Sequence, residues 1–149
     1  MVHNDAQSYW VVVCDEFQAT FYSREKKYSP MQALALLQND VAREKSGDLV
    51  SDRGGRAFDS QGQGRHTMGG EKTDPKSQAN VVFAKEIAER VSAAQSQQRF
   101  DRLIVVAAPR FLGLLRPALA SAGIEPERTI DKEVVGRDAA VIEKLLADP

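Results

Sequence analysis

The chain has 149 residues, 42% of them hydrophobic and 28% charged, a composition that predicts one globular domain with a single core. Twenty basic and 21 acidic residues leave a net charge of −1, so the whole-molecule field does not draw the chain onto nucleic acid or anionic lipid. The single cysteine, Cys14, excludes an internal disulfide, and its apolar neighbours predict an inert buried thiol. The sequence has neither an apolar leader nor a stretch of roughly 18 apolar residues, so we expect a cytoplasmic protein that uses no membrane.

The N-terminal third predicts three β-strands. Aromatic and β-branched residues at 9–14 indicate a buried strand, and alternation at 18–23 indicates its antiparallel return, with Asp15 near the hairpin turn. Residues 34–38 are too few for their period to separate strand from helix, but the flanking proline and Asn-Asp pair favour a third strand. Residues 41–50 are compatible with a short helix.

A long flexible loop is predicted at about 51–76. This segment holds six of the ten glycines and only three apolar side chains. Connections in compact domains usually run about 4–6 residues, and unstructured ones longer than about 12–15 are usually functional or disordered. This loop is therefore the first candidate for a functional segment.

Beyond the loop, Asp74 can cap a helix that has Pro75 at its first position. Apolar residues recur in this helix at helical spacing, at Phe83, Ile87, Val91 and Ala94. The uninterrupted apolar run 103–108 is typical of a central strand that is covered on both faces.

The C-terminal part predicts a helix, a strand and a last helix. Apolar residues within 111–122 form one face of the first helix, and the glycine after them should end it. Pro117 should kink this helix or delay its start. A weaker strand is predicted at 128–131 and a helix from about Asp138. Its inward-facing residues should be Val141, Ile142, Leu145 and Leu146.

The order of these elements predicts an α/β fold. Parallel strands joined through helices cross over right-handed, so the late strands should add beside the first strand. The result is a mixed five-stranded sheet in the order 3-2-1-4-5, in which only the second strand runs antiparallel, with helices on both faces. This is the ribonuclease H-like arrangement, formed as a single domain by residues 1–149.

Several residue strings match one known family, at 50–60, 64–66, 73–75, 83–84, 108–113, 115–116 and 130–132. In these strings the chain resembles the bacterial host-attachment protein family over nearly its whole length. The resemblance implies a relation to Pelota and to the middle domain of archaeo-eukaryotic class-1 release factors, and hence a ribosome-linked role. The family name implies attachment to host cells, but without an export signal or anchor an indirect phenotype is favoured over adhesion.

Release factors of that kind carry a Gly-Gly-Gln loop immediately before the long helix, where this chain has Gly62-Gln63-Gly64. In that chemistry glycines allow close backbone approach, and a main-chain donor at the glutamine stabilises charge that develops on the ester. Gln63 is therefore the candidate catalytic residue. The order of the three residues differs, and the alternative is a plain docking loop.

The same loop carries a candidate RNA-binding surface. Arg53, Arg56, Arg65 and His66 could contact phosphates, with Lys72 and Lys76 beside them and Phe58 stacked on a base. The alternative is that neighbouring acidic residues simply pair with these side chains in solvent, because they leave the loop close to neutral.

Arg110 follows the predicted fourth strand, beside the topological switch point where open α/β sheets bind ligands. There it could hold an anion at a helix start. The alternative is a surface arginine in a structural Pro-Arg-Phe turn.

Metal and cofactor chemistry has little support in the sequence. Two histidines and one cysteine cannot form a zinc cluster, and no glycine-rich cofactor fingerprint occurs. A two-metal nuclease of this fold could use Asp15 with Glu86 or Glu89, but the fourth strand ends without an acid. We expect no metal and no cofactor.

These observations predict a ribosome- or RNA-associated factor, acting in peptide release or in rescue of stalled ribosomes. The alternative is a non-enzymatic interaction module whose long loop orders on a protein partner.

Overall fold

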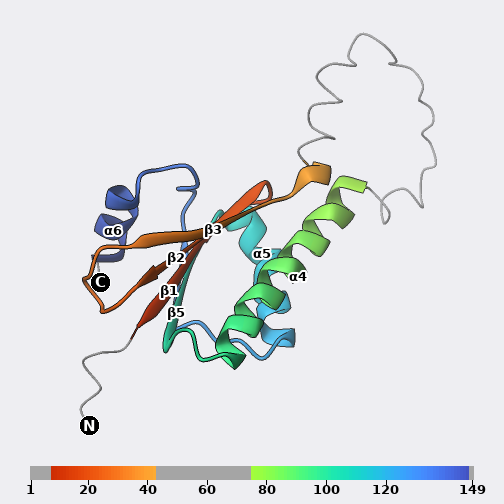
Figure 1. Ribbon diagram of the computed structural model, residues 1–149. Helices are drawn as coiled ribbons and strands as arrows, with labels where there is room; N and C mark the ends of the chain where they lie inside the picture. Colours follow the sequence, from red (N-terminus) through yellow and green to blue (C-terminus); the bar gives the residue numbers. More distant parts are fainter. Residues whose placement is uncertain (1–7, 43–74, 148–149) are drawn as a thin grey trace, which may run out of the picture.

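The computed structural model describes residues 8–42 and 75–147. Eight elements lie in these two stretches (Figure 1): β1 Tyr9–Cys14, β2 Gln18–Arg24, β3 Gln32–Gln38, α4 Pro75–Ser96, β5 Arg102–Ala107, α5 Pro109–Ser121, β6 Arg128–Asp131 and α6 Ala139–Ala147. Within the same stretches, no helix is both long and apolar enough to cross a membrane.

The five strands form one sheet in the order β3-β2-β1-β5-β6. β2 pairs antiparallel with β1 and β3, whereas β1–β5 and β5–β6 are parallel pairs. This confirms the predicted order 3-2-1-4-5 and the ribonuclease H-like arrangement. The central position of β5 follows from its continuous apolar sequence, because only a strand with both faces covered can bury such a run.

Helices cover both faces of the sheet. Alternate residues of β1 divide between the two cores: Trp10 and Val12 pack under α4 and α5, and Val11 and Val13 pack under α6. Figure 1 shows α4 and α5 on one side of the sheet and α6 on the other. All four inward-facing residues predicted for α4 are buried, and the thiol of Cys14 is fully buried as well.

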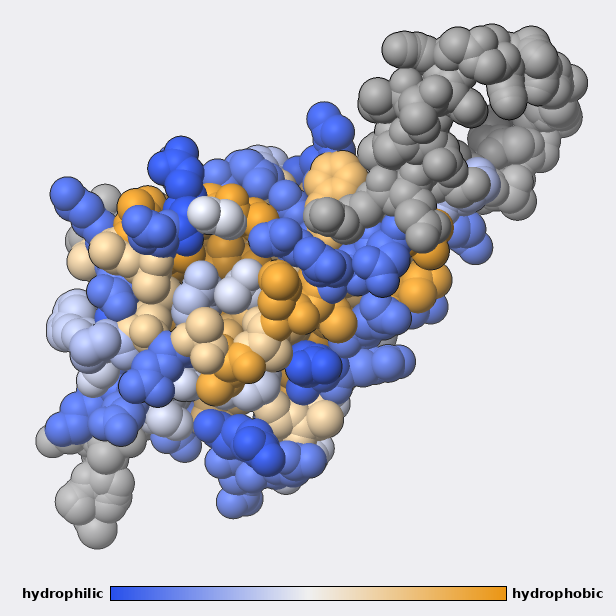
Figure 2. Space-filling model, turned by 45° about the horizontal axis from the view of Figure 1, so that its top comes forward, coloured by the Kyte–Doolittle hydropathy of each residue, from blue (hydrophilic) through white to orange (hydrophobic). Residues whose placement is uncertain are grey.

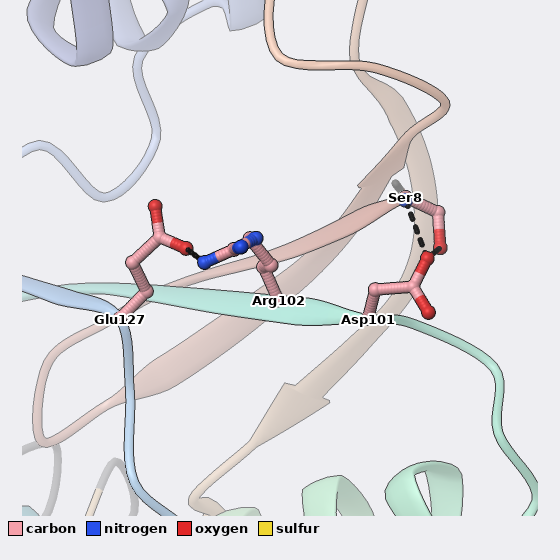
Figure 3. Close-up of polar contacts among 4 residues, drawn as sticks. All are labelled: Ser8, Asp101, Arg102 and Glu127. Atoms are coloured by element: carbon pink, nitrogen blue, oxygen red, sulfur yellow. Dashed lines mark hydrogen bonds and ion pairs between the residues drawn. The ribbon is translucent and has the colours of Figure 1, made fainter. Parts of the chain in front are cut away.

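The amino end of the parallel strands is closed by polar contacts (Figure 3). The main-chain N–H of Ser8 donates to Asp101 Oδ2 at 2.8 Å, and the Arg102 guanidinium pairs with Glu127. These contacts tie the start of β1 to β5, and β5 to the residue before β6. Each of the four groups already has a structural role, so this end of the sheet offers little for binding.

The observed boundaries of the elements differ from the predicted ones by a few residues. β3 begins two residues earlier than predicted, at Gln32, and β5 ends at Ala107 because Ala108 is the cap residue of α5. Residues 40–42 are helical, and the rest of the helix predicted at 41–50 lies outside the described residues.

Pro117 does not delay α5, which begins at Pro109 and continues through Pro117 to Ser121. The prediction of a delay was therefore wrong. The residue four positions earlier, whose carbonyl loses its partner at a proline, is Gly113, and a Cβ placed on it would meet no atom of another element within 4 Å. The helix then ends as predicted, because Gly123 adopts φ +77° and the Ile124 N–H returns to the Leu119 carbonyl at 2.9 Å.

The last helix buries a narrower face than predicted. Ile142 and Leu146 are buried and Leu145 is half-buried, but Val141 is 40% exposed. The inward position predicted for Val141 was wrong, because this nine-residue helix packs on the sheet mainly through Ile142 and Leu146, at i and i+4, with Ala139 and Leu145 partly buried beside them. Glu143 Oε2 also accepts a hydrogen bond from the Met31 N–H at 2.7 Å, which ties α6 to the start of β3.

Candidate functional site

The carboxyl edge of the sheet gathers most of the chain's candidate groups. β1, β3, β5 and β6 all end at this edge, and α5 begins there directly after β5. The Ala108 N–H donates to the Cys14 carbonyl at 3.1 Å, so the start of α5 lies against the end of β1. Because β1 has an antiparallel neighbour on one side and a parallel one on the other, this is the topological switch point of the sheet.

Asp15 organises the β1–β2 turn at this edge. Its Oδ1 accepts hydrogen bonds from the main-chain N–H groups of Phe17 at 2.8 Å and Gln18 at 3.0 Å. A side chain that bonds its own backbone two residues on is the Asx turn, which fixes a tight reversal. The turn role predicted for Asp15 is confirmed, and its carboxylate is buried in that role.

A second carboxyl group, that of Glu133, meets Asp15 from the β6–α6 connection. Partial burial, a hydrogen bond with Asp15 and the negative charges of Asp15 and Glu16 raise the pKa of Glu133 from 4.5 to about 7. The Glu133 carboxyl can donate this hydrogen bond only when it is protonated. Burial, together with the nearby carboxylates, also raises the pKa of the Cys14 thiol, which therefore stays protonated and unreactive.

Asn39 joins three parts of the chain beside this turn. It is buried, and its Nδ2 donates to the Glu16 carbonyl at 2.9 Å and to Asn80 Oδ1 at 3.2 Å, with a longer contact to the Ala79 carbonyl at 3.5 Å. Its Oδ1 accepts from the Ala42 N–H at 3.3 Å, the geometry of a helix N-cap. The β1–β2 turn, the helical turn 40–42 and the first turns of α4 are thus held by one side chain.

A groove of about 510 Å³ lies between the helical turn and α4. Its walls combine apolar and polar side chains, and two of its valines are strongly exposed: Val41 at 48% and Val82 at 52%. Asp40, Gln78 and Glu86 supply polar groups along it. The groove is therefore a mixed surface with acidic character. It lies where the described chain breaks off after residue 42 and resumes with α4 at residue 75.

Comparison with known proteins places this chain in a family. The family model described as "Protein required for attachment to host cells" matches residues 10–146. The chain belongs to this host-attachment family. No match was found among curated proteins.

Comparison of the host-attachment chain with solved structures gives partial matches, among them the following two. One is the Aquifex aeolicus Ppx/GppA phosphatase, with 10% identity and a TM-score of 0.40 over 84% of this chain and 36% of that one. The other is the PilM-PilN type IV pilus biogenesis complex, with 13% identity and a TM-score of 0.43 over 95% of this chain and 41% of that one. This chain spans less than half the length of either.

Of the predicted RNA-binding residues, the described structure places Lys76 in the first turn of α4 and Arg110 in the first turn of α5. Arg110 is exposed, at the switch point where the sequence predicted it. Its position is compatible with anion binding, because the free N–H groups of a helix start also favour negative charge. The remaining predicted site residues lie outside the described stretches: Arg53, Arg56, Gly62, Gln63, Gly64, Arg65 and His66.

The carboxylates weighed for a nuclease do not converge in the part of the chain that the structure describes. No group of three His, Cys, Asp or Glu side chains there could hold a metal ion. Asp15 is occupied by the turn, Glu86 lines the groove beside Asn39, and Glu89 lines a different hollow between α4 and α5.

Sequence reasoning missed two residues of this site. Asn39 was treated as a strand-ending residue, although an asparagine directly before a helical segment is also an N-cap signal that could have been used. Glu133 carried no signal, because its partner Asp15 is 118 positions away in the chain (133 − 15 = 118) and only the fold brings them together.

The raised pKa of Glu133 predicts a pH dependence of stability. In the folded state Glu133 holds its proton up to about pH 7, whereas in the unfolded chain it loses it near 4.5, so stability falls as pH rises between these values. Glu133→Gln should remove this slope and be more stable than wild type above pH 7 by about 0.5–1 kcal/mol, a small value because water screens an exposed carboxyl. Urea unfolding from about pH 4 to 8 measures it, with the exposed Glu125→Gln as the control; parallel curves for wild type and Glu133→Gln would contradict the carboxyl pair.

Proposed function

We propose that this host-attachment protein is a ribosome- or RNA-associated factor that makes its contact through residues 51–76 and the carboxyl edge of the sheet. The supporting observation is the position of Asn39, which is hydrogen-bonded both to the turn before residue 43 and to the start of α4 after residue 74. The described residues on either side of 43–74 therefore lie at one end of the domain.

This end also carries Arg110. Arginine binds phosphate in a bidentate way and is the side chain best suited to an RNA backbone. Together with Arg53, Arg56, Arg65 and His66, it would form a basic surface beside the switch point. The acidic β1–β2 turn lies at the same edge and repels phosphate, so the contact would engage only a few phosphates, through these residues.

Co-sedimentation of the purified protein with ribosomes at increasing salt tests this proposal. Each phosphate contact releases condensed counterions, so we expect association at low salt that weakens steeply as salt rises. Absence of association at low salt, or association that salt does not affect, would reject an RNA contact.

The finer proposal assigns ester hydrolysis in peptide release to the Gly62-Gln63-Gly64 segment, by its likeness to the release-factor loop. Glycines on both sides would let the backbone enter a crowded centre, and the Gln63 N–H would stabilise developing negative charge. Gln63→Pro, which removes this N–H, should slow release of a peptide from ribosome-bound peptidyl-tRNA several-fold and leave ribosome association unchanged. Gln61→Pro is the matched control, and equal release rates for both variants would remove the Gln63 N–H from the chemistry.

A second candidate function is a protein-interaction module, which the groove beside Asn39 favours. Its exposed valines, Val41 and Val82, and its acidic side chains suit a peptide with apolar and basic residues better than they suit an RNA backbone. The sedimentation experiment separates the two functions, because an apolar contact persists, or strengthens, as salt rises.

A further inference from the structure

The outer edge of the sheet is unusual in its composition. β3 is an edge strand of seven residues, Gln-Ala-Leu-Ala-Leu-Leu-Gln, without a charged residue or a proline. Natural edge strands usually carry such residues, because a row of unpaired N–H and C=O groups invites another strand. Apolar side chains gather on the surface of this molecule (Figure 2), and large exposed ones include Leu34 at 49% and Leu36 at 54%.

The register of β3 determines which of its main-chain groups point outward. The Asn39 N–H donates to the Phe17 carbonyl at 2.9 Å, just beyond the Gln18–Gln38 pair. In an antiparallel ladder this makes Gln18–Gln38 a pair without hydrogen bonds between its two members, and the alternation repeats at Thr20–Leu36. The N–H and C=O groups of Leu36 and Gln38 therefore point away from β2.

A β-bulge limits the regular part of this edge. Phe21 pairs with Ala35 and Tyr22 with Ala33, so Leu34 is an extra residue without a partner on β2. The bulge bends the strand at Leu34 and leaves residues 35–38 as the regular stretch that a further strand could extend.

The side chains of this stretch are apolar on both faces of the sheet. Leu36 lies across from Thr20 and Val13, on the α6 side, but beyond the cover of that helix. Leu37 lies across from Ala19 on the opposite side, half-buried against the core under α4. A strand added here would cover apolar surface on each face.

We propose that a second copy of this chain pairs with β3 in an antiparallel arrangement, with a two-fold axis at Leu37. In this register Leu36 of each copy is opposite Gln38 of the other, and these are the residues whose main-chain groups point outward. Each of the two pairs exchanges both of its hydrogen bonds. Leu37 meets its symmetry mate in the closer, non-hydrogen-bonded position, about 4.5 Å between Cα atoms.

The self-complementarity of the strand favours a second copy over a different partner. A two-fold interface requires that a patch match itself, and the stretch 36–38 does so in the register centred on Leu37, which pairs both of its outward-pointing residues, Leu36 and Gln38, with each other across the axis. The strand has no charge to select a different partner, and a net charge of −1 per chain opposes self-association only weakly.

Sedimentation velocity over a range of protein concentrations tests this interface in the full chain. We expect a reversible monomer–dimer equilibrium in wild type. Leu36→Lys should raise the dimer dissociation constant roughly tenfold or more, because the altered pair occurs twice in the dimer. Leu34→Lys is the matched control: it introduces the same charge on the same strand at similar exposure, but outside the paired stretch, and should leave the constant unchanged.

A second variant guards against an indirect effect of the lysine. Leu36→Pro removes an N–H that points away from β2, so it should keep the β2–β3 ladder and the thermal unfolding midpoint close to wild type while abolishing the dimer. A wild type that stays monomeric at every concentration overturns the proposal. A dimer that persists in both Leu36 variants also overturns it, because association would then use another surface.

Discussion

Asn39→Ala should lower the free energy of unfolding by about 2–3 kcal/mol, a large effect for one polar side chain. The substitution leaves the buried Ala42 N–H and the part-buried Glu16 carbonyl without their hydrogen-bond partner. Loss of an N-cap alone costs about 1 kcal/mol, and each buried group left unpaired adds a desolvation penalty. Urea unfolding followed by circular dichroism measures the change.

Asn80→Ala is the graded control for this prediction. It removes one partner of Asn39 but leaves the contacts to Glu16 and Ala42 in place, so it should cost only about 0.5–1.5 kcal/mol. If Asn39→Ala lost no more stability than Asn80→Ala, Asn39 would not be the residue that joins the helical turn 40–42 to α4. The proposed function would then lose its structural support as well.

On the proposed RNA contact, Arg56→Ala combined with Arg65→Ala should weaken ribosome association roughly ten- to hundredfold at low salt. Each lost phosphate contact removes about one unit from the slope of log affinity against log salt, so the double variant should lower the slope by about two. Co-sedimentation at several salt concentrations gives both quantities from one series.

Lys85→Ala combined with Arg116→Ala provides the matched control for charge. Both residues are exposed on the helices, Lys85 on α4 and Arg116 on α5, and their removal changes the net charge by the same two units. This control should retain the wild-type slope. If the control and the Arg56/Arg65 variant weakened association equally, the effect would come from net charge, and the interaction-module alternative would be favoured.

The local elements of this fold could be predicted because their signals are short-range. β1 and β6 have the predicted bounds, and α4 begins at the predicted Pro75, since apolar runs, helical spacing and a proline at the first position act within a few residues. The errors occur where packing decides. Val141 has an apolar side chain at helical spacing, but the face that α6 packs on the sheet is centred on Ile142 and Leu146 and leaves Val141 exposed.

The candidate site was predictable only in part. Arg110 was predicted because a strand followed by a helix places its connection at the carboxyl edge of a parallel sheet. The hydrogen bonds of Asn39 to α4 and of Glu133 to Asp15 join residues far apart in the chain, and nothing in either local sequence indicates the partner.

The sequence by itself therefore determined the strands, the helices and their order, and with them the sheet topology, because hydrophobic periodicity and the right-handed crossover leave few alternatives. Only the tertiary structure decided that Asn39 joins the helical turn 40–42 to α4, that Glu133 is hydrogen-bonded to Asp15, and that β3 presents Leu36 and Gln38 outward. Each of these depends on distances and register between segments distant in the chain, which are set when the two cores pack.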